Sequence, residues 1–384
     1  MRKTDPKVDE AIQTLNMKDG PSRRRLLAGT GLVSATAAAS ALLAACSSNS
    51  TASAGTKEAA GSFPKTPAWK FYFVNHVTTN SFFTPTQYGM ADAASLLGLP
   101  TPVWGGSENQ VISQMVSNFD TAVAAGAAGI ALAAISGTAF TAPVSSAMEK
   151  GIPVVTYNAD GEIDNGKAVI GSNRLCYVGQ SNFTAGQSMG TEIMALVPGG
   201  GDIVIFTPQV GTGNTQPRYD GIKSVLTSKY NVAEQQTAAT ESAAQPAQKA
   251  YLNSHKSSLK GAFCIDSTDT TLLGGLLKEL GMDIPAGGWD TTNPTIPSIQ
   301  SGELQFTMYQ DPYLQGFLPV VYLYLFNLSG GVLSPPNTDT GLSIVTKSNV
   351  STYVASSRYQ GTTTAEKYIT RSGAINAPQA STST

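Results

Sequence analysis

Short apolar strands alternate with longer segments of helical periodicity along most of this chain. The stretches "GIALAAI" and "IPVVTYN" are apolar over nearly their whole length, which is typical of strands in a parallel sheet that helices cover on both faces. Segments such as "SENQVISQMVSNFDTAVAAG" instead repeat their apolar residues at helical spacing. This alternation predicts an α/β fold built from strand–helix–strand units.

The alternation runs twice, once on each side of residues 177–182. The folded part would have about 300 residues, which is more than one hydrophobic core usually holds. We therefore predict two α/β lobes, each built on a doubly wound parallel sheet. In such open sheets a ligand binds beside the carboxyl ends of the strands, so functional residues are expected there.

Residues 1–45 have the composition of an export signal. A polar, basic head is followed by "SRRRLL", which resembles the twin-arginine export motif, and by the apolar run "VSATAAASALLAA". The run leads into "LAAC", which resembles a bacterial lipobox and predicts lipidation of Cys46. The small residues before Cys46 favour a cleaved signal over the alternative of an uncleaved transmembrane helix. We expect an exported protein that Cys46 anchors to lipid on the outer face of the cytoplasmic membrane.

Two further segments are too polar and too rich in small residues to bury a core. Residues 46–66 are predicted to form a flexible tether, and residues 371–384 a loose tail. The apolar stretch "FLPVVYLYLFNL" is too short to span a bilayer and lies inside the alternating pattern, so we assign it to the folded body.

Charge and cysteine content limit the partners. Beyond residue 45 the chain carries 17 basic and 22 acidic residues, which gives a net charge near −5. It has no basic stripe and no polybasic patch, which argues against nucleic acid and anionic lipid as binding partners. Cys176 and Cys264 lie in apolar, strand-like segments, which favours buried free thiols over a disulfide.

Polar and aromatic side chains follow the predicted strands at the point where each strand ends. The first strand ends at His76, with Asn80, Phe82 and Phe83 just beyond it, and a later helix begins near Arg218. Other strand ends carry amides and carboxylates: Asn158, Asp160, Asp266, Asp290 and Gln310. The spacing of histidines and cysteines is not that of a metal site, and "GTGN" lacks the further residues of a dinucleotide site, so we expect no metal and no cofactor.

These side-chain types suit a small, uncharged, polyhydroxylated ligand. A hydroxyl group both donates and accepts hydrogen bonds, which carboxylates, amides and a guanidinium satisfy in fixed directions. The carbon-bound hydrogens of a sugar form apolar faces, against which Phe82 or Phe83 would pack in a cleft. The alternatives are that both rings fill a core under the first helix, and that Asp266 and Asp290 cap helix N-termini.

In their order along the chain, these segments resemble the type I periplasmic sugar-binding proteins of ABC importers, specifically their ribose-binding branch. The similarity covers roughly residues 69–346. It is carried by "TNSFF", "IPVVTYNAD", "RYDGI", "AFCID", "GGWDTT" and "FTMYQDP". The resemblance implies ligand contacts for the matching residues of these segments: Asn80, Phe82, Phe83, Asn158, Asp160, Arg218, Asp266, Asp290 and Gln310.

The resemblance also implies two lobes joined by three hinge segments, the periplasmic binding protein fold of type I, which closes around its ligand. One lobe would comprise residues 67–178 and 311–342, and the other residues 179–310 and 343–370. The implied partners are a small carbohydrate and an ABC permease in the membrane. We expect a monomer that is not an enzyme.

Three positions depart from the ribose-binding pattern. Asn158 and Ala159 stand where ribose binders carry Asp-Arg, so one charged clamp on a pyranose is missing, and Asp160 is expected to substitute for it. His76 replaces a small polar residue and would add a donor or an acceptor, while Gln245 and its neighbours replace an aromatic residue of the second lobe. These departures favour a linear polyol or another small pentose-like compound over a ribopyranose.

Two other functions are considered. "GQSMG" fits the Gly-x-Ser-x-Gly pattern of a serine hydrolase with Ser188 as nucleophile and Asp220 and His255 as partners, but a nucleophile elbow needs a strand before it, which the sequence does not predict. A ligand sensor that signals to a membrane receptor would use the same fold and cleft. No Gly-x-x-x-x-Gly-Lys-Ser/Thr loop occurs in the sequence, so the chain is not itself an ATPase.

Overall fold

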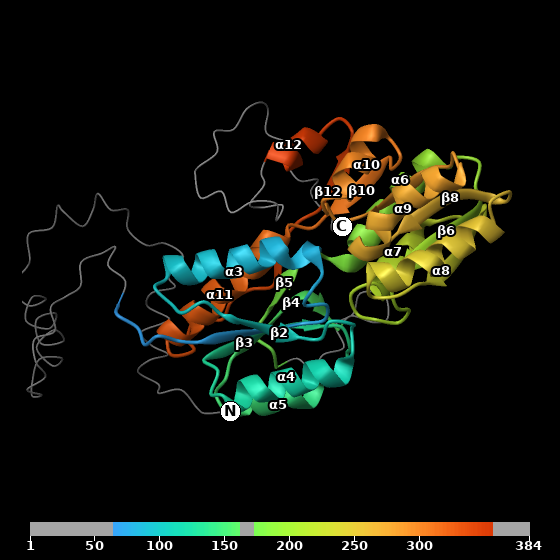
Figure 1. Cartoon of the computed structure of the whole chain (residues 1–384). Coiled ribbons are helices and arrows are strands. Elements are labelled where there is room, and N and C mark those ends of the chain that lie inside the picture. Colours follow the sequence, from blue (N-terminus) through green and yellow to red (C-terminus); the bar gives the residue numbers. More distant parts are fainter. Residues whose placement is uncertain (1–63, 162–172, 356–384) are drawn as a thin grey trace, which may run out of the picture. The chain divides into compact units, whose positions relative to one another are not determined.

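The computed structural model describes residues 64–161 and 173–355, which form the two parallel-sheet α/β lobes that the sequence predicts (Figure 1). The predicted export signal, the lipidation site Cys46, most of the tether and the tail lie outside the described residues. Of the helices that the structure describes, none has the length and apolarity needed to cross a membrane.

The first lobe is a six-stranded sheet between two layers of helices. Its strands are β1 (Phe71–Asn75), β2 (Val103–Gly106), β3 (Gly129–Ala134), β4 (Val154–Asp160), β5 (Tyr177–Gly179) and β11 (Thr338–Asp339). Its helices are η1 (Ser81–Phe83), α3 (Thr84–Leu96), α4 (Ile112–Ala124), α5 (Thr141–Glu149) and α11 (Pro312–Leu328). The strand order is β11-β5-β4-β3-β1-β2, and the paired strands run parallel.

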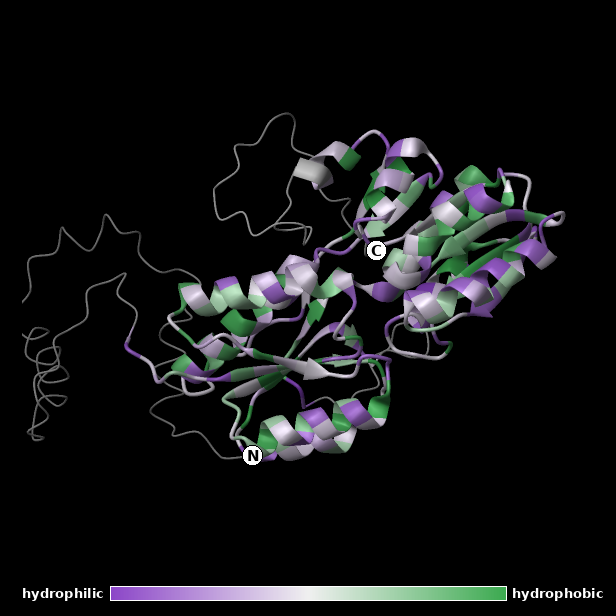
Figure 2. Ribbon diagram, in the orientation of Figure 1, coloured by the Kyte–Doolittle hydropathy of each residue, from purple (hydrophilic) through white to green (hydrophobic). Residues whose placement is uncertain are grey.

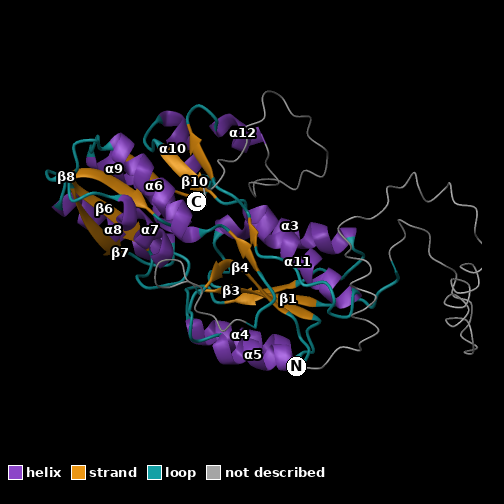
Figure 3. Ribbon diagram, turned by 180° about the vertical axis from the view of Figure 1, so that it is seen from behind, coloured by secondary structure: helices purple, strands orange, loops and turns teal. Residues whose placement is uncertain are grey.

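Helices cover both faces of this sheet, with α3 and α11 on one face and α4 and α5 on the other (Figures 1 and 3). This double cover explains why the strands are apolar throughout, since neither face meets water. All six residues of β3 are buried, and the apolar colour of the strands in Figure 2 shows the same pattern. The long apolar stretch assigned to the folded body is most of α11, which packs against α3.

The second lobe repeats this plan. Its strands are β6 (Gly201–Thr207), β7 (Tyr230–Gln236), β8 (Leu259–Cys264), β9 (Ala286–Trp289), β10 (Phe306–Tyr309) and β12 (Ser343–Thr346). Its helices are α6 (Asn182–Leu196), α7 (Gln216–Val225), α8 (Glu241–Ser254), α9 (Ser267–Leu280), α10 (Thr295–Ser301) and α12 (Val350–Ala355). The order is β12-β10-β9-β8-β6-β7, in which only the pairing of β10 with β12 is antiparallel.

The strand β7 and the helix α8 were not identified from the sequence. β7 lies at the edge of its sheet and pairs only with β6, and most of its residues are half-exposed. An edge strand of this kind needs few apolar residues, so "YNVAEQQ" lacks the continuous apolar signal of the central strands.

The chain crosses between the two sheets three times, between β5 and β6, between β10 and β11, and between β11 and β12. In each sheet the strand order reverses at one point, between β1 and β3 in the first lobe and between β6 and β8 in the second. Connections leave the sheet in opposite directions at such a point and open a crevice beside the carboxyl ends of the strands.

Candidate functional site

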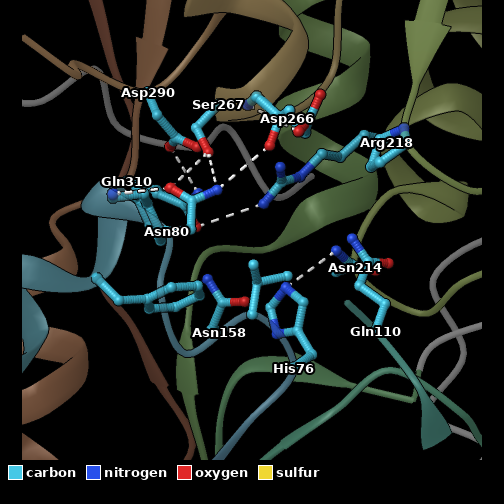
Figure 4. A pocket seen from close by; sticks show the side chains of 15 residues that line it. His76, Asn80, Gln110, Asn158, Asn214, Arg218, Asp266, Ser267, Asp290 and Gln310 are labelled. Carbon is cyan, nitrogen blue, oxygen red and sulfur yellow. Dashed lines mark hydrogen bonds between the residues drawn. The ribbon is translucent and has the colours of Figure 1, made fainter. Parts of the chain in front are cut away.

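A polar pocket lies beside these strand ends, and residues from both lobes line it (Figure 4). Nine of the ten residues that the sequence singled out are among its lining residues: His76, Asn80, Phe82, Phe83, Asn158, Arg218, Asp266, Asp290 and Gln310. The space left between the side chains is about 360 Å³, including the part open to solvent. A pocket of this size has room for a small molecule.

Arg218 is the central cation of the pocket. Gly186 allows the first turn of α7 to pack directly against α6, because a Cβ at this glycine would lie 2.2 Å from the carbonyl oxygen of Arg218. The guanidinium donates from Nε to the Asn182 Oδ1 at 2.8 Å and from Nη1 to the carbonyl oxygen of Ile265 at 2.8 Å. It also stacks 4.3 Å from the ring centroid of Trp289. These contacts hold its plane in one orientation, which suits directional hydrogen bonding to a ligand.

Asp290 and Gln310 lie beside this guanidinium. Gln310 donates from Nε2 to Asp290 Oδ1 at 2.8 Å, and its Oε1 accepts from Arg218 Nη2 at 3.4 Å. Burial raises the pKa of Asp290 to about 7, while the charge of Arg218 and the bond from Gln310 oppose the rise. Asp290 does not cap a helix, since α10 begins only at Thr295. Its carboxylate is therefore an acceptor at the pocket wall.

Asp266 has both of the roles considered for it. It is the N-cap of α9 and accepts from the backbone N–H groups of Thr268 at 2.8 Å and Asp269 at 3.3 Å, and it also lines the pocket. Burial raises the pKa of Asp266, and these hydrogen bonds oppose the rise. Capping and ligand contact are thus compatible at this carboxylate.

Asn80 connects the two lobes across the pocket. Its Oδ1 accepts from the Phe82 N–H at 2.9 Å, which starts the short helix η1. Its Nδ2 donates to the hydroxyl groups of Ser267 at 3.0 Å and Thr268 at 3.3 Å on the second lobe. An amide in this position can exchange these bonds for bonds to a ligand.

Phe82 and Phe83 have both of the roles considered for them, as core residues and as rings that face the ligand pocket. Both belong to the core cluster beneath α3, and both also line the pocket. Their ring centroids are 4.7 Å apart at an interplanar angle of 78°, and Phe83 lies edge-on to His76 at 5.3 Å. The core therefore fixes the position of the apolar surface that these rings present to the pocket.

His76 is a buried, neutral imidazole. Burial lowers its pKa to about 3, and the charge of Arg218 contributes to the lowering. Its Nε2 lies 3.4 Å from the Nδ2 of Asn214, which belongs to the second lobe. The residue is thus a hydrogen-bonding group and carries no charge near neutral pH.

Backbone strain concentrates at the pocket. The described non-glycine residues with positive φ are Gln110 (58°), Asn158 (61°), Asp290 (73°) and Asp311 (52°). The first three line the pocket, and the fourth follows Gln310 directly. Asn158 is held by a hydrogen bond from its Nδ2 to the Gln315 Oε1 at 3.1 Å. Left-handed backbone is unfavourable at Gln110, whereas asparagine and aspartate tolerate it better than other residues with side chains. Residues in this conformation cluster at functional sites.

The structure places Asp160 away from the pocket lining, in contrast to its predicted role as a substitute clamp. Its carboxylate is paired with the guanidinium of Arg174, whose Nε lies 2.5 Å from Oδ1 and whose Nη2 contacts Oδ2, and it accepts from Thr156. This buried ion pair has a structural role between β4 and β5. Gln245 lies exposed on α8 and also does not line the pocket.

Sequence reasoning missed six lining residues: Val77, Gln110, Pro208, Asn214, Ser267 and Thr268. Gln110 follows β2 and Asn214 follows β6, so the rule used for the other strand ends applies to them as well. Both lie in loops of several residues, where the sequence does not show which side chain turns inward.

The positions of Ser188 and His255 argue against the serine hydrolase alternative. Ser188 lies within α6, and its hydroxyl donates to the carbonyl oxygen of Thr184 at 3.2 Å. His255 is exposed at the end of α8 and stacks on Tyr251. The glycines of this motif serve helix packing, as Gly186 does beside Arg218. Among the described residues, no group of three or more His, Cys, Asp or Glu could hold a metal ion.

Two α/β lobes that share a polar pocket at their strand ends define the class of two-lobed substrate-binding proteins. This chain belongs to the periplasmic binding protein domain family, whose profile matches residues 71–326. The family and the homologues are substrate-binding proteins, so the chain is a binding protein and not an enzyme, as predicted.

Known relatives agree with this assignment. The chain is 42% identical over 316 residues to the xylose/arabinose-binding protein XylF of Sulfolobus acidocaldarius, which covers 80% of this chain and 78% of that protein. An ABC transporter solute-binding protein from Burkholderia graminis, solved in complex with D-arabinose, is 25% identical with a TM-score of 0.67 and covers 75% of this chain and 99% of that one. A carbohydrate transporter protein from Acidothermus cellulolyticus shares the fold at 23% identity and a TM-score of 0.67, over 77% of this chain and 100% of its own.

Proposed function

We propose that this chain is the extracytoplasmic sugar-binding protein of an ABC importer and that its ligand is a pentose, xylose or arabinose. The observation that carries the proposal is one pocket in which amides, carboxylates and a fixed guanidinium from both lobes surround two phenylalanine rings. A pentose offers hydroxyl groups to the polar groups and carbon-bound hydrogens to the rings. The names of two relatives, which refer to xylose and arabinose, support the choice of a pentose.

Ligand binding and lobe closure are coupled in this proposal. Asn80 and Asn158 belong to the first lobe, and Arg218, Asp266 and Asp290 to the second. A sugar that contacts both groups binds the closed arrangement more tightly than an open one, so it shifts the population towards the closed state. The closed complex would then be recognised by the membrane permease.

We further propose that Cys46 carries a lipid anchor after twin-arginine export. The lobes would be held at the outer face of the cytoplasmic membrane by residues 46–66, close to the permease. Wild-type protein should incorporate a labelled fatty acid in growing cells, and Cys46→Ala should not. Equal incorporation by the two proteins, or none by wild type, would contradict the anchor.

Isothermal titration calorimetry with a ligand panel tests the pentose assignment. The panel contains D-xylose, L- and D-arabinose, D-ribose, D-glucose and the linear polyols xylitol and arabinitol, which the sequence departures favoured. We expect the tightest binding for xylose or arabinose, and mass spectrometry of ligand retained through purification should find a pentose. Tightest binding to ribose, glucose or a polyol would overturn the assignment.

An uptake assay distinguishes a transport protein from the alternative of a ligand sensor. Deleting the gene should abolish uptake of the labelled pentose in cells that otherwise take it up. Normal uptake combined with loss of a transcriptional response to the sugar would instead favour a sensor.

A further inference from the structure

Three buried polar atoms in the pocket have no hydrogen-bond partner among the described residues. They are Nδ1 of His76, Oε1 of Gln110 and Oδ1 of Asn214. The three side chains are 5%, 6% and 6% exposed, and the three atoms themselves have almost no exposed surface. Native proteins rarely leave buried polar atoms unpaired, and such atoms at a binding site point to a ligand group.

The protonation of His76 follows from its surroundings. The lowered pKa keeps the imidazole neutral, with one N–H group and one bare nitrogen. In the orientation that the Asn214 amide has in the structure, its Nδ2 faces the Nε2 of His76 at 3.4 Å and can only donate, so Nε2 accepts. Nδ1 therefore carries the proton. The three free atoms are one donor and two acceptors.

The backbone holds Gln110 at this position. The Gln110 N–H donates to the carbonyl oxygen of His76 at 2.9 Å, and the neighbouring N–H groups of Asn109 and Val111 donate to the hydroxyl of Ser107 at 3.2 and 3.0 Å. These bonds keep Gln110 at a φ of 58°, which is unfavourable for a residue with a side chain. The loop thus maintains a strained backbone that turns the Gln110 side chain into the pocket.

We propose that His76, Gln110 and Asn214 form a hydroxyl-reading subsite, with Gln110 as a specificity-determining residue. The subsite binds one hydroxyl group of the sugar, which accepts from Nδ1 of His76 and donates to Oε1 of Gln110 or Oδ1 of Asn214. The inference rests on the proposed function and assigns part of the ligand to this subsite. In the view of Figure 4 the three side chains lie on the other side of the pocket from Asp290, so the subsite reads a different hydroxyl from the one that Asp290 binds.

The chemistry of the subsite selects a neutral hydroxyl over charged groups. A carboxylate would accept from His76 but would face two carbonyl oxygens, and an ammonium group would suit those oxygens but would oppose the N–H of Nδ1. A hydrogen or a methyl group would leave all three atoms unpaired. The subsite therefore discriminates against sugar acids, amino sugars and deoxy sugars modified at this one position.

Titration calorimetry with monodeoxy sugars tests the subsite in the full-length folded protein. The ligands are the pentose that binds wild type best and its monodeoxy derivatives at each hydroxyl. The variants are Gln110→Gly, which removes the side chain and accepts the positive φ, Asn214→Ala, and Asp290→Asn. Gln245→Ala, an exposed glutamine outside the pocket, is the matched control.

One monodeoxy sugar should lack the hydroxyl group that the subsite binds. We expect wild type and Gln245→Ala to bind this derivative at least about tenfold more weakly than the parent pentose. That penalty should fall below about threefold in at least one of Gln110→Gly and Asn214→Ala, namely in the variant that removes the oxygen to which the hydroxyl donates, while the penalties at other positions persist. Asp290→Asn should reduce the affinity penalty of a sugar that lacks a different hydroxyl group. If Gln110→Gly does not fold, as circular dichroism would show, Asn214→Ala carries the same test.

Penalties that persist at every position in both Gln110→Gly and Asn214→Ala would overturn the subsite and leave the pentose assignment intact. The subsite would also be overturned if Asp290→Asn reduced the affinity penalty of the same monodeoxy sugar, because both ends of the pocket would then bind one hydroxyl group. Failure of wild type to bind any pentose would overturn the proposed function and, with it, the subsite.

Discussion

Replacing Asp290 by asparagine should weaken sugar binding and at the same time stabilise the free protein near neutral pH. The carboxylate accepts from Gln310 at 2.8 Å and lies beside Arg218 in a buried wall of the pocket. Asparagine has nearly the same side-chain shape as aspartate and tolerates the φ of 73° at this position. It replaces one carboxylate oxygen by an amide group, so a ligand hydroxyl that donates to the carboxylate loses a strong acceptor.

The expected loss in affinity follows from the strength of a hydrogen bond to a charged group. Such bonds contribute about 1.5–3 kcal/mol, which corresponds to about 10- to 150-fold in Kd. Asp290→Ala should lose at least tenfold for the same reason. Titration calorimetry with xylose or arabinose at pH 8, where the wild-type carboxyl is ionised, measures the difference.

The pH dependence supplies a sharper test. With a pKa of about 7 in the free protein, Asp290 is protonated as the pH falls, and a hydroxyl donor favours its ionised form. Wild-type affinity should fall about fivefold between pH 7 and pH 6, and by up to about tenfold per pH unit below that. Asp290→Asn should lose this part of the pH dependence, which leaves only the contribution of Asp266, whose pKa burial also raises.

The stability of the free protein should change in the opposite direction. Because burial raises the pKa of Asp290 from 3.8 to about 7, its contribution to stability is greatest below pH 3.8 and is lost as the pH rises through 7. The full loss corresponds to about 4 kcal/mol, and the gain in Asp290→Asn stays below this because Arg218 loses a neighbouring carboxylate. Chemical denaturation at pH 5 and pH 8 measures the effect. Equal pH dependence of affinity and stability in wild type and variant would refute the reasoning.

Three further predictions concern single side chains. Arg218→Lys should weaken sugar binding at least about tenfold in calorimetry, because lysine cannot reproduce the stacking on Trp289 or the fixed donor fork, and an unchanged Kd would contradict this. Asn80→Ala should lower affinity and, by removing bonds between the lobes, increase the radius of gyration of the free protein in X-ray scattering; equal radii would contradict the second part. Arg174→Ala should destabilise the fold by about 3–5 kcal/mol in denaturant, because it leaves Asp160 buried without its cation, and should leave the Kd within twofold. A weaker Kd at unchanged stability would place Asp160 in the site.

The central strands were predictable because both faces of each sheet are covered. β3 and β4 are buried along their whole length, so an apolar run without polar alternation marks them in the sequence. The edge strand β7 carries no such mark, because all of its residues are partly or fully exposed and it pairs with β6 alone. Predictability thus depended on burial.

The candidate site was predictable only where a strand leads directly into it. Asp290 and Gln310 each follow the last residue of a strand, so the strand itself sets their position. Gln110 and Asn214 lie in loops. A positive φ and a backbone hydrogen bond to His76 orient Gln110, and the bond from the Gly213 N–H to the carbonyl oxygen of Ile135 holds the loop of Asn214. Asp160 satisfied the rule for strand ends, but Arg174, fourteen positions later, holds its carboxylate.

The amino-acid sequence by itself determined the α/β class, the division into two lobes and the edge of each sheet at which polar residues gather. These follow from local periodicity and from the direction that parallel strands share. The tertiary structure alone decided which of those residues face one pocket, which carboxylate is neutralised by an ion pair, and which polar atoms remain for a ligand. Each of these depends on contacts between residues far apart in the chain, as between Asn80 and Ser267 or between His76 and Asn214, and no local pattern encodes such distances.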